Sequence, residues 1–180
     1  MTACPTLETE RLILRPFSDR DVQDYFQMMS TPELRRSFRI LEHEGISEAF
    51  TAVAAWRGEW ELRGTGHWAV EERASGQLIG RAGLHNPERP DWPGVEVGWA
   101  LHPASWGFGF ATEAGREAVR YGFEELGEER LFSTILVDNE RSQAVAQRLG
   151  FVWVETKTLS HFPQEPHGIW VLDRESWAQD

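Results

Sequence analysis

The sequence predicts an α/β domain with a mixed, mostly antiparallel sheet and helices on both faces. The spacing of hydrophobic residues changes along the chain between a period of about two, typical of strands, and about 3.6, typical of helices. Apolar strands at residues 95–101 and 131–138 enclose one helix, which predicts a parallel pair joined by a right-handed crossover. The earlier strands are separated by short turns and should pair antiparallel. A length of 180 residues fits one domain over residues 1–180.

Capping residues and glycines indicate where the helices begin and end. Ser18–Asp21 predicts a capping box before the first helix, and Ser47 predicts the cap of the second. Asn139 predicts the cap of a short helix that Gly150 ends. The apolar stripe of the second helix is expected to comprise Phe50, Val53, Trp56 and Trp60.

The strands follow from period-two patterns bounded by turn residues. Residues 86–94 hold three prolines and predict a surface loop. Gly98 interrupts a strand and predicts a β-bulge, which we favour, or a close approach of backbone. The alternative is packing against a large neighbour such as Trp99. Strands are expected at 11–15, 67–73, 77–84, 95–101, 131–138, 151–155 and 169–172, and the later helices at 112–126 and 139–149.

The composition argues against several classes of function. A net charge of −11 makes nucleic acid an unfavourable partner, because an acidic surface repels phosphate. The same charge suits a cationic acceptor such as an amine, although solubility alone explains it equally well. Cys4 is the only cysteine, which excludes a cysteine cluster, and no metal is expected. No apolar stretch is long enough for a signal peptide or a membrane span, so we expect a cytoplasmic protein without membrane contact.

The segment His102–Ala114, HPASWGFGFATEA, joins a strand to the start of a helix. A helix N-terminus has unpaired N–H groups and the positive end of the helix dipole. Gly107 and Gly109 let the backbone approach an anion closely, so the segment predicts a pyrophosphate site. A Walker loop would need a lysine and a dinucleotide fingerprint a third glycine, and neither stands at the required spacing. A tight turn without a ligand is the alternative.

The same segment resembles the acyl-CoA signature of the GNAT superfamily of N-acetyltransferases, Q/R-x-x-G-x-G/A. Gly109 takes the central glycine and Ala111 the final small residue, whereas Trp106 stands where Gln or Arg is usual. A tryptophan at this position resembles the signature of the branch that acetylates ribosomal-protein N-termini. LETERLILRPFSDRD, VEVGWALHP and NERSQAVAQRLGF also resemble that branch, so the resemblance covers nearly the whole chain.

The resemblance implies that acetyl-CoA is the cosubstrate and lies where the central parallel strands splay apart. Asn139 would contact the CoA arm, a role that stands beside its physical role as a helix cap. Glu113 is expected to be structural, since a carboxylate pointing inward would repel the pyrophosphate. The implied CoA-binding residues are Ala100, Leu101 and His102 for the pantetheine arm, Trp106, Gly107, Phe108, Gly109, Phe110, Ala111 and Thr112 for the pyrophosphate, and Asn139.

Two residues are candidates for proton transfer. Glu96 lies on the strand implied to bind the pantetheine, and a carboxylate there can accept a proton from an amine. Its alternative is a solvated residue or a partner for an arginine. The family's usual tyrosine acid is replaced by Ala146, and the ribosomal-protein branch implies Ser142 as the acid, with an ordinary capping serine as the alternative. His85 and His102 border the expected site as weaker candidates.

The resemblance therefore implies an N-acetyltransferase that moves the acetyl group of acetyl-CoA to a primary amine by direct attack. The acceptor is either a protein N-terminus or a small amine, and homodimers are frequent in this family. Two other classes stay open from the sequence. A non-catalytic acyl-CoA-binding module is favoured by Ala146 and disfavoured by Glu96, and a nucleotide-binding regulator is disfavoured by the missing lysine.

Overall fold

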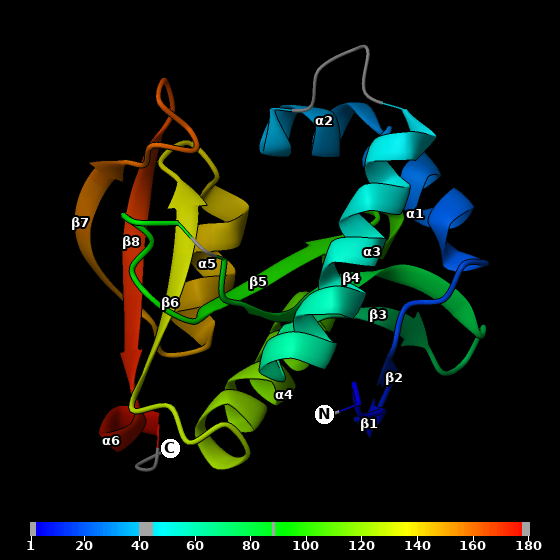
Figure 1. The fold of residues 1–180 in the computed structure, drawn as a ribbon, viewed down its shortest axis with the longest axis horizontal. Helices are drawn as coiled ribbons and strands as arrows, with labels where there is room; N and C mark the ends of the chain where they lie inside the picture. Colours follow the sequence, from blue (N-terminus) through cyan, green and yellow to red (C-terminus); the bar gives the residue numbers. More distant parts are fainter. Residues whose placement is uncertain (1–2, 40–44, 88, 178–180) are drawn as a thin grey trace.

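The computed structural model describes residues 3–39, 45–87 and 89–177 (Figure 1). Its strands are β1 (Leu7–Glu8), β2 (Leu12–Arg15), β3 (Gly66–Glu72), β4 (Gln77–His85), β5 (Glu96–Leu101), β6 (Arg130–Leu136), β7 (Val152–Thr158) and β8 (Pro166–Asp173). Its helices are α1 (Asp21–Met29), α2 (Pro32–Phe38), α3 (Ile46–Arg63), α4 (Phe110–Glu124), α5 (Glu140–Arg148) and α6 (Arg174–Trp177), with a 3-10 turn, η1, at Pro103–Ser105. None of these helices is long and apolar enough to cross a membrane.

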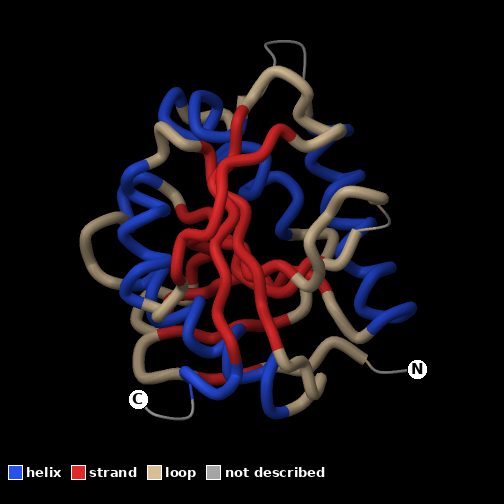
Figure 2. The backbone as a smooth tube through the Cα atoms, turned by 90° about the vertical axis from the view of Figure 1, so that its left-hand side faces the viewer, coloured by secondary structure: helices blue, strands red, loops and turns tan. Residues whose placement is uncertain are grey.

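The strands form one sheet in the order β1-β2-β3-β4-β5-β6-β8-β7, in which β5 and β6 pair parallel. Figure 2 shows the strands running through the middle of the molecule with helices outside them. One buried cluster lies between the sheet and α4 and includes Trp68 and Val119. A second lies under α1 and α3 and includes Phe17 and Ala69. Since neighbours along a strand point to opposite faces, helices cover both faces, and the predicted fold class is confirmed.

Several boundaries differ from the prediction, and each difference has a local cause. The structure adds β1, α2, η1 and α6, which are too short to show a hydrophobic period. The N-cap of α3 is Gly45 rather than Ser47, and its N–H is satisfied by Glu48 Oε2 at 2.7 Å. Only half of the predicted capping box is present. Asp21 Oδ2 accepts the Ser18 N–H at 2.7 Å, but the Ser18 hydroxyl donates to the same oxygen at 2.7 Å instead of accepting from the helix.

Two predictions about packing are wrong as well. Phe50 is 55% exposed and lies outside the buried stripe of α3. Gly98 is not at a bulge, because β5 pairs with β4 through six residues without a register shift. A Cβ at Gly98 would lie 3.1 Å from the His67 ring, so the glycine makes room for His67.

The parallel strands β5 and β6 separate soon after they meet. Glu96 and Phe132 are the registered pair. Beyond them, side chains replace the backbone ladder. Ser133 Oγ donates to the Val97 carbonyl at 3.0 Å, and Thr134 N donates to Glu96 Oε1 at 3.0 Å. Because an unpaired buried backbone group is costly, these bonds allow the sheet to open without that cost.

Glu113 ties the segment before α4 to the N-terminal strands. Its carboxylate accepts from Thr9 Oγ1 at 2.5 Å, from Arg11 N at 2.8 Å and from Arg11 Nε at 2.7 Å. The same guanidinium donates to the Phe108 carbonyl at 2.8 Å. Burial alone would raise the pKa of Glu113, but these bonds and the Arg11 charge hold it below its usual value. Glu113 therefore makes the structural contacts expected of it.

Glu113→Gln should lower the free energy of unfolding by about 1–3 kcal/mol at neutral pH, because a neutral amide replaces a charged acceptor. The folded-state pKa is lowered, so this contribution is present above the unfolded pKa and is lost as the pH falls through the folded pKa. The difference between the two proteins should therefore shrink below about pH 4.5. Urea unfolding at several pH values measures it, with exposed Glu61→Gln in α3 as control. A difference that does not change with pH would contradict this role.

Candidate active site

Two cavities meet where β5 and β6 separate. The large cleft, of about 750 Å³, is lined by the end of β5, parts of residues 105–112, and α5. The small pocket, of about 290 Å³, is lined by β3 to β6, by the loop after β4, and by the ends of α2 and β8. Ser37, Phe38, Trp99, Asn139 and Ser142 line both. Molecules bound in the two cavities can therefore contact each other at this junction.

One wall of the large cleft is the N-terminus of α4. Gly107 and Gly109 have φ angles of 85° and 83°, a region that residues with a side chain rarely adopt. Glu113 N donates to the Gly109 carbonyl at 3.0 Å. The N–H groups of Phe110–Thr112 precede that bond and are unpaired within the helix. The segment therefore presents backbone donors and the positive helix end to an anionic ligand.

The structure brings most of the predicted CoA-binding residues together. The large cleft is lined by Ala100, Leu101, Trp106, Gly107, Gly109, Phe110, Ala111, Thr112 and Asn139. His102 and Phe108 do not line it. The His102 ring accepts the Ala104 N–H at 3.1 Å, and the Phe108 side chain is 62% exposed. Trp106 Nε1 donates to the Leu101 carbonyl at 2.8 Å, which holds the segment at the end of β5.

Two cations of the large cleft were missed by the sequence analysis. Arg141 and Arg148 of α5 both line it, and Arg141 Cζ lies 4.6 Å from the centre of the Trp106 ring. Their spacing of seven residues places them on one face of the helix, a signal that was available in the sequence. Two guanidinium groups beside a helix N-terminus suit a ligand with several phosphates.

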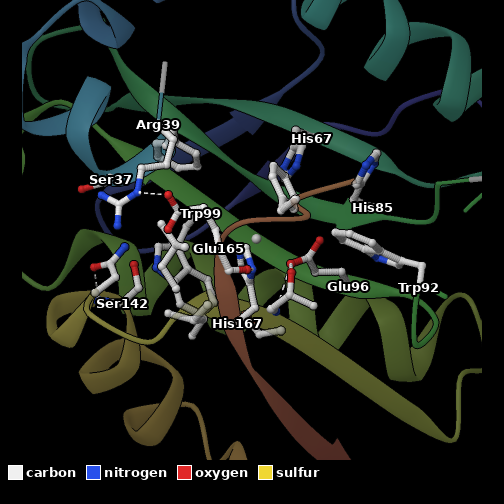
Figure 3. Close-up of a pocket in the computed structure, with 18 of the residues that line it drawn as sticks. Ser37, Arg39, His67, His85, Trp92, Glu96, Trp99, Ser142, Glu165 and His167 are labelled. Atoms are coloured by element: carbon white, nitrogen blue, oxygen red, sulfur yellow. Dashed lines mark hydrogen bonds and ion pairs between the residues drawn. The ribbon is translucent and has the colours of Figure 1, made fainter. Parts of the chain in front are cut away.

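Glu96 lies in the wall of the small pocket, near Trp92 and His85 (Figure 3). Its Oε1 accepts from both the backbone N–H and the hydroxyl of Thr134. In residues 3–39, 45–87 and 89–177, Oε2 has no hydrogen-bond partner. Burial raises the pKa of Glu96, and the Thr134 bonds offset this only in part. A carboxylate with a raised pKa and one open oxygen can exchange a proton with a ligand.

Histidines lie beside Glu96. His85 Nδ1 is 2.8 Å from Glu59 Oε2, and the rings of His85 and His67 stack at 6.0 Å. Burial, together with the charge of Arg81, holds the pKa of His67 well below its usual value, so this ring is neutral. Among the described residues, no group of three or more His, Cys, Asp or Glu side chains is placed to hold a metal.

Asn139 and Ser142 lie at the junction of the two cavities. Asn139 Oδ1 accepts the Ser142 N–H at 3.2 Å, so the predicted cap of α5 is present. The Ser142 hydroxyl has no hydrogen-bond partner in the part of the chain that the structure describes, and it lines both cavities. Ala146, one turn further along α5, is buried in the core.

The small pocket also contains residues that no sequence pattern marks. Arg89 and Trp92 belong to the loop predicted to lie on the surface, and both line the pocket. Arg39 ends α2 with a φ of 54°. Its guanidinium lies 2.8 Å from Asp138 and 3.3 Å from Glu165, which joins α2 to the opposite wall. Contacts between segments far apart in the sequence place these side chains, so local spacing does not reveal them.

Comparison with known proteins agrees with this geometry. The family model for the GNAT acetyltransferase domain matches residues 11–152. The chain is 32% identical to the N-acetyltransferase YoaA of Bacillus subtilis over 82% of both chains. It is 28% identical to the FsC-acetyl coenzyme A-N(2)-transacetylase of Aspergillus fumigatus, over 98% of this chain and 80% of that protein. The ribosomal-protein-S5-alanine acetyltransferase of Vibrio fischeri shares the fold with a TM-score of 0.78 and 18% identity, over 96% of this chain and 98% of that chain.

The class of protein follows from the fold and the family match together: an acyltransferase that uses acetyl-CoA. More particularly, the matched residues span most of the chain, and this protein belongs to the GNAT acetyltransferase family. The resemblance to the GNAT superfamily seen in the sequence is confirmed. The likeness to ribosomal-protein acetyltransferases is also found by sequence comparison, at 27% identity over 79% of the chain.

Gly109→Val should abolish measurable acetyl-CoA binding, because a β-branched residue strains a φ of 83° and would turn the donors of α4 away from the cleft. Isothermal titration calorimetry with acetyl-CoA measures the affinity. Gly58→Val in α3, where a Cβ meets nothing within 4 Å, is the control and should bind normally. Unchanged affinity in Gly109→Val would exclude this segment as the binding site.

Proposed function

We propose that this protein transfers the acetyl group of acetyl-CoA, bound in the large cleft, to a primary amine bound in the small pocket. The observation that carries the proposal is that Ser37, Phe38, Trp99, Asn139 and Ser142 line both cavities. The thioester and the amine can meet at this junction, so attack can be direct, without a covalent enzyme intermediate.

The proposed position of acetyl-CoA follows from the donors of the large cleft. The pyrophosphate accepts from the backbone N–H groups of residues 107–112, and Arg141 and Arg148 add positive charge. The pantetheine arm runs along Ala100 and Leu101, where β5 no longer pairs with β6. This orientation directs the thioester toward Asn139 and Ser142 at the junction.

Glu96 is the proposed general base. As the amine nitrogen attacks the thioester carbonyl, its proton passes to Glu96 Oε2, directly or through one water. The C–S bond then breaks, and the thiolate takes a proton from the Ser142 hydroxyl, which is free of protein partners in the described ranges. Ser142 regains a proton from solvent and Glu96 releases its own to solvent, which restores both groups. The raised pKa of Glu96 supports its role, because a base is most effective when its pKa approaches the working pH.

With a panel of primary amines, the wild-type protein should release free thiol and form an acetylated amine. Glu96→Gln should lower kcat/KM by roughly 10²–10⁴-fold, the usual contribution of a positioned base. The glutamine oxygen can still accept the two bonds from Thr134, so the sheet should stay open. The loss in kcat/KM should become smaller as the pH rises from about 6 to 9, because more of the amine is already deprotonated at the higher pH. Near-normal rates across this range would exclude Glu96 as the base.

Ser142→Ala should lower kcat and leave the affinity for acetyl-CoA nearly unchanged, since the proposed interaction is made only as the thiolate departs. The Ser142 backbone N–H, which Asn139 caps, is retained in this variant. Ser47→Ala, near the start of α3 and away from both cavities, is the matched control. A variant with full kcat would leave Ser142 with a role in the helix start alone.

A further inference from the structure

Among the described residues that line the small pocket, guanidinium groups outnumber carboxylates, although the net charge of the chain is −11. The walls of the pocket carry the guanidinium groups of Arg39, Arg81 and Arg89 and the carboxylates of Glu96 and Glu165. Glu165 pairs with Arg39 at 3.3 Å, and Glu96 is bonded to β6. In the described ranges, no carboxylate pairs with Arg81 or Arg89. The expectation that an acidic chain attracts a cationic acceptor therefore does not extend to this pocket.

Within the described part of the chain, Arg81 is held in place without a counter-ion. Its Nη1 donates to His67 Nε2 at 2.9 Å. Its guanidinium lies 5.3 Å from the centre of the Phe38 ring and 5.1 Å from that of Trp56. Its Nε is buried and, among the described residues, has no hydrogen-bond partner. These contacts, together with the neighbouring Tyr25 hydroxyl, fix the orientation of the cation. The buried Nε is closed to solvent, so a ligand in the pocket would meet the terminal nitrogens of the guanidinium.

Arg89 adds a second positive charge in the loop after β4. Its guanidinium lies 4.8 Å from the centre of the Trp92 ring. Burial lowers the pKa of Arg89. The negative charges of Glu96 and Asp91 raise it, but neither carboxylate forms a direct ion pair with Arg89. The Asp91 carboxylate is itself bonded to Ser160 N at 2.6 Å. Arg89 is thus partly removed from water and, among the described residues, has no carboxylate in contact.

We infer that the acceptor carries a carboxylate in addition to its amine, and that Arg81 binds this carboxylate while Arg89 contributes charge. This inference rests on the proposed function, because it names the class of acceptor for the same pocket. The planar guanidinium matches a carboxylate with two parallel hydrogen bonds, and partial removal from water strengthens such a pair. A bare diamine would instead bring a second positive charge toward two arginines.

The size of the small pocket agrees with an amino-acid-like acceptor. Its volume of about 290 Å³ is at the low end for a small-molecule site. Arg81 and Glu96 lie on the same face of neighbouring strands, since Arg81 pairs with Ala100 and Glu96 with His85. The acceptor can therefore place its carboxylate at one end of the pocket and its amine at the other.

The test compares each carboxylate with its own amide. The probes are α-amino acids and ω-amino acids from glycine to 6-aminohexanoate, each paired with the corresponding amide, plus O-phosphoethanolamine paired with ethanolamine. Thiol release and mass spectrometry of the product give kcat/KM. The favoured amino acid should exceed its amide by about tenfold or more, as expected for a charge-assisted pair. In Arg81→Gln this ratio should fall toward one, and in Arg81→Lys it should be intermediate, because the charge is kept without the planar geometry.

Control measurements separate this result from misfolding. Arg116→Gln, on the exposed surface of α4, should keep both the rate and the ratio of the wild type. Thermal unfolding and acetyl-CoA affinity check that Arg81→Gln is folded. Titration of butyrate and of butyramide into the CoA-bound protein measures binding without turnover. Butyrate should bind and butyramide should not. Arg81→Gln should abolish the binding of butyrate.

The outcomes distinguish this inference from the proposed function. Equal rates for acids and amides, or a preference for O-phosphoethanolamine, would overturn the inference that the acceptor carries a carboxylate. The proposed acetyl transfer would remain intact. The same holds if only diamines or peptide N-termini are acetylated. If no amine is acetylated although butyrate binds through Arg81, the proposed function fails and the carboxylate site stands. If neither amines nor butyrate respond, both are overturned.

Discussion

The opening between β5 and β6 is the constraint on which both cavities depend. A continuous ladder would close them, because paired strands lie only about 4.8 Å apart. The strands can stay separated because Thr134 N donates to Glu96 Oε1 and Ser133 Oγ donates to the Val97 carbonyl. Both bonds to Glu96 go to Oε1, so Oε2 stays available to a ligand. One carboxylate can thus support the open sheet and also serve as the proposed base.

The two cavities differ in how far the sequence predicts them, because local signals mark only one of them. The large cleft includes the turn and helix start at residues 105–112, whose backbone geometry depends on Gly107 and Gly109. Glu113 and Arg11 then hold that segment against the N-terminal strands. The small pocket is formed by side chains from many elements, and Arg89 reaches it from a loop without any periodic pattern. The cosubstrate is therefore evident from the sequence, whereas the acceptor site is not.

The incorrect predictions have the same origin. A glycine within a strand correctly indicates a close approach at Gly98, but only the pairing of β3, β4 and β5 reveals that the neighbour is His67. Likewise, a serine before an apolar run suggests a cap at Ser47, although the N-cap lies two residues earlier at Gly45, whose N–H donates to Glu48 Oε2. In each case the local signal identifies a constraint, and the partner that meets the constraint is selected by the rest of the fold.

Charge in the small pocket also affects the strength of the proposed base. Burial raises the pKa of Glu96, while the positive charge of Arg81 acts in the opposite direction. A carboxylate bound to Arg81 would neutralise part of that positive field, so Glu96 would be a stronger base with the acceptor in place than in the empty pocket. The ammonium group of the same acceptor would then face a more basic carboxylate, which favours transfer of its proton to Glu96. An acceptor with an anionic group therefore fits the proton transfer as well as the shape and charge of the pocket.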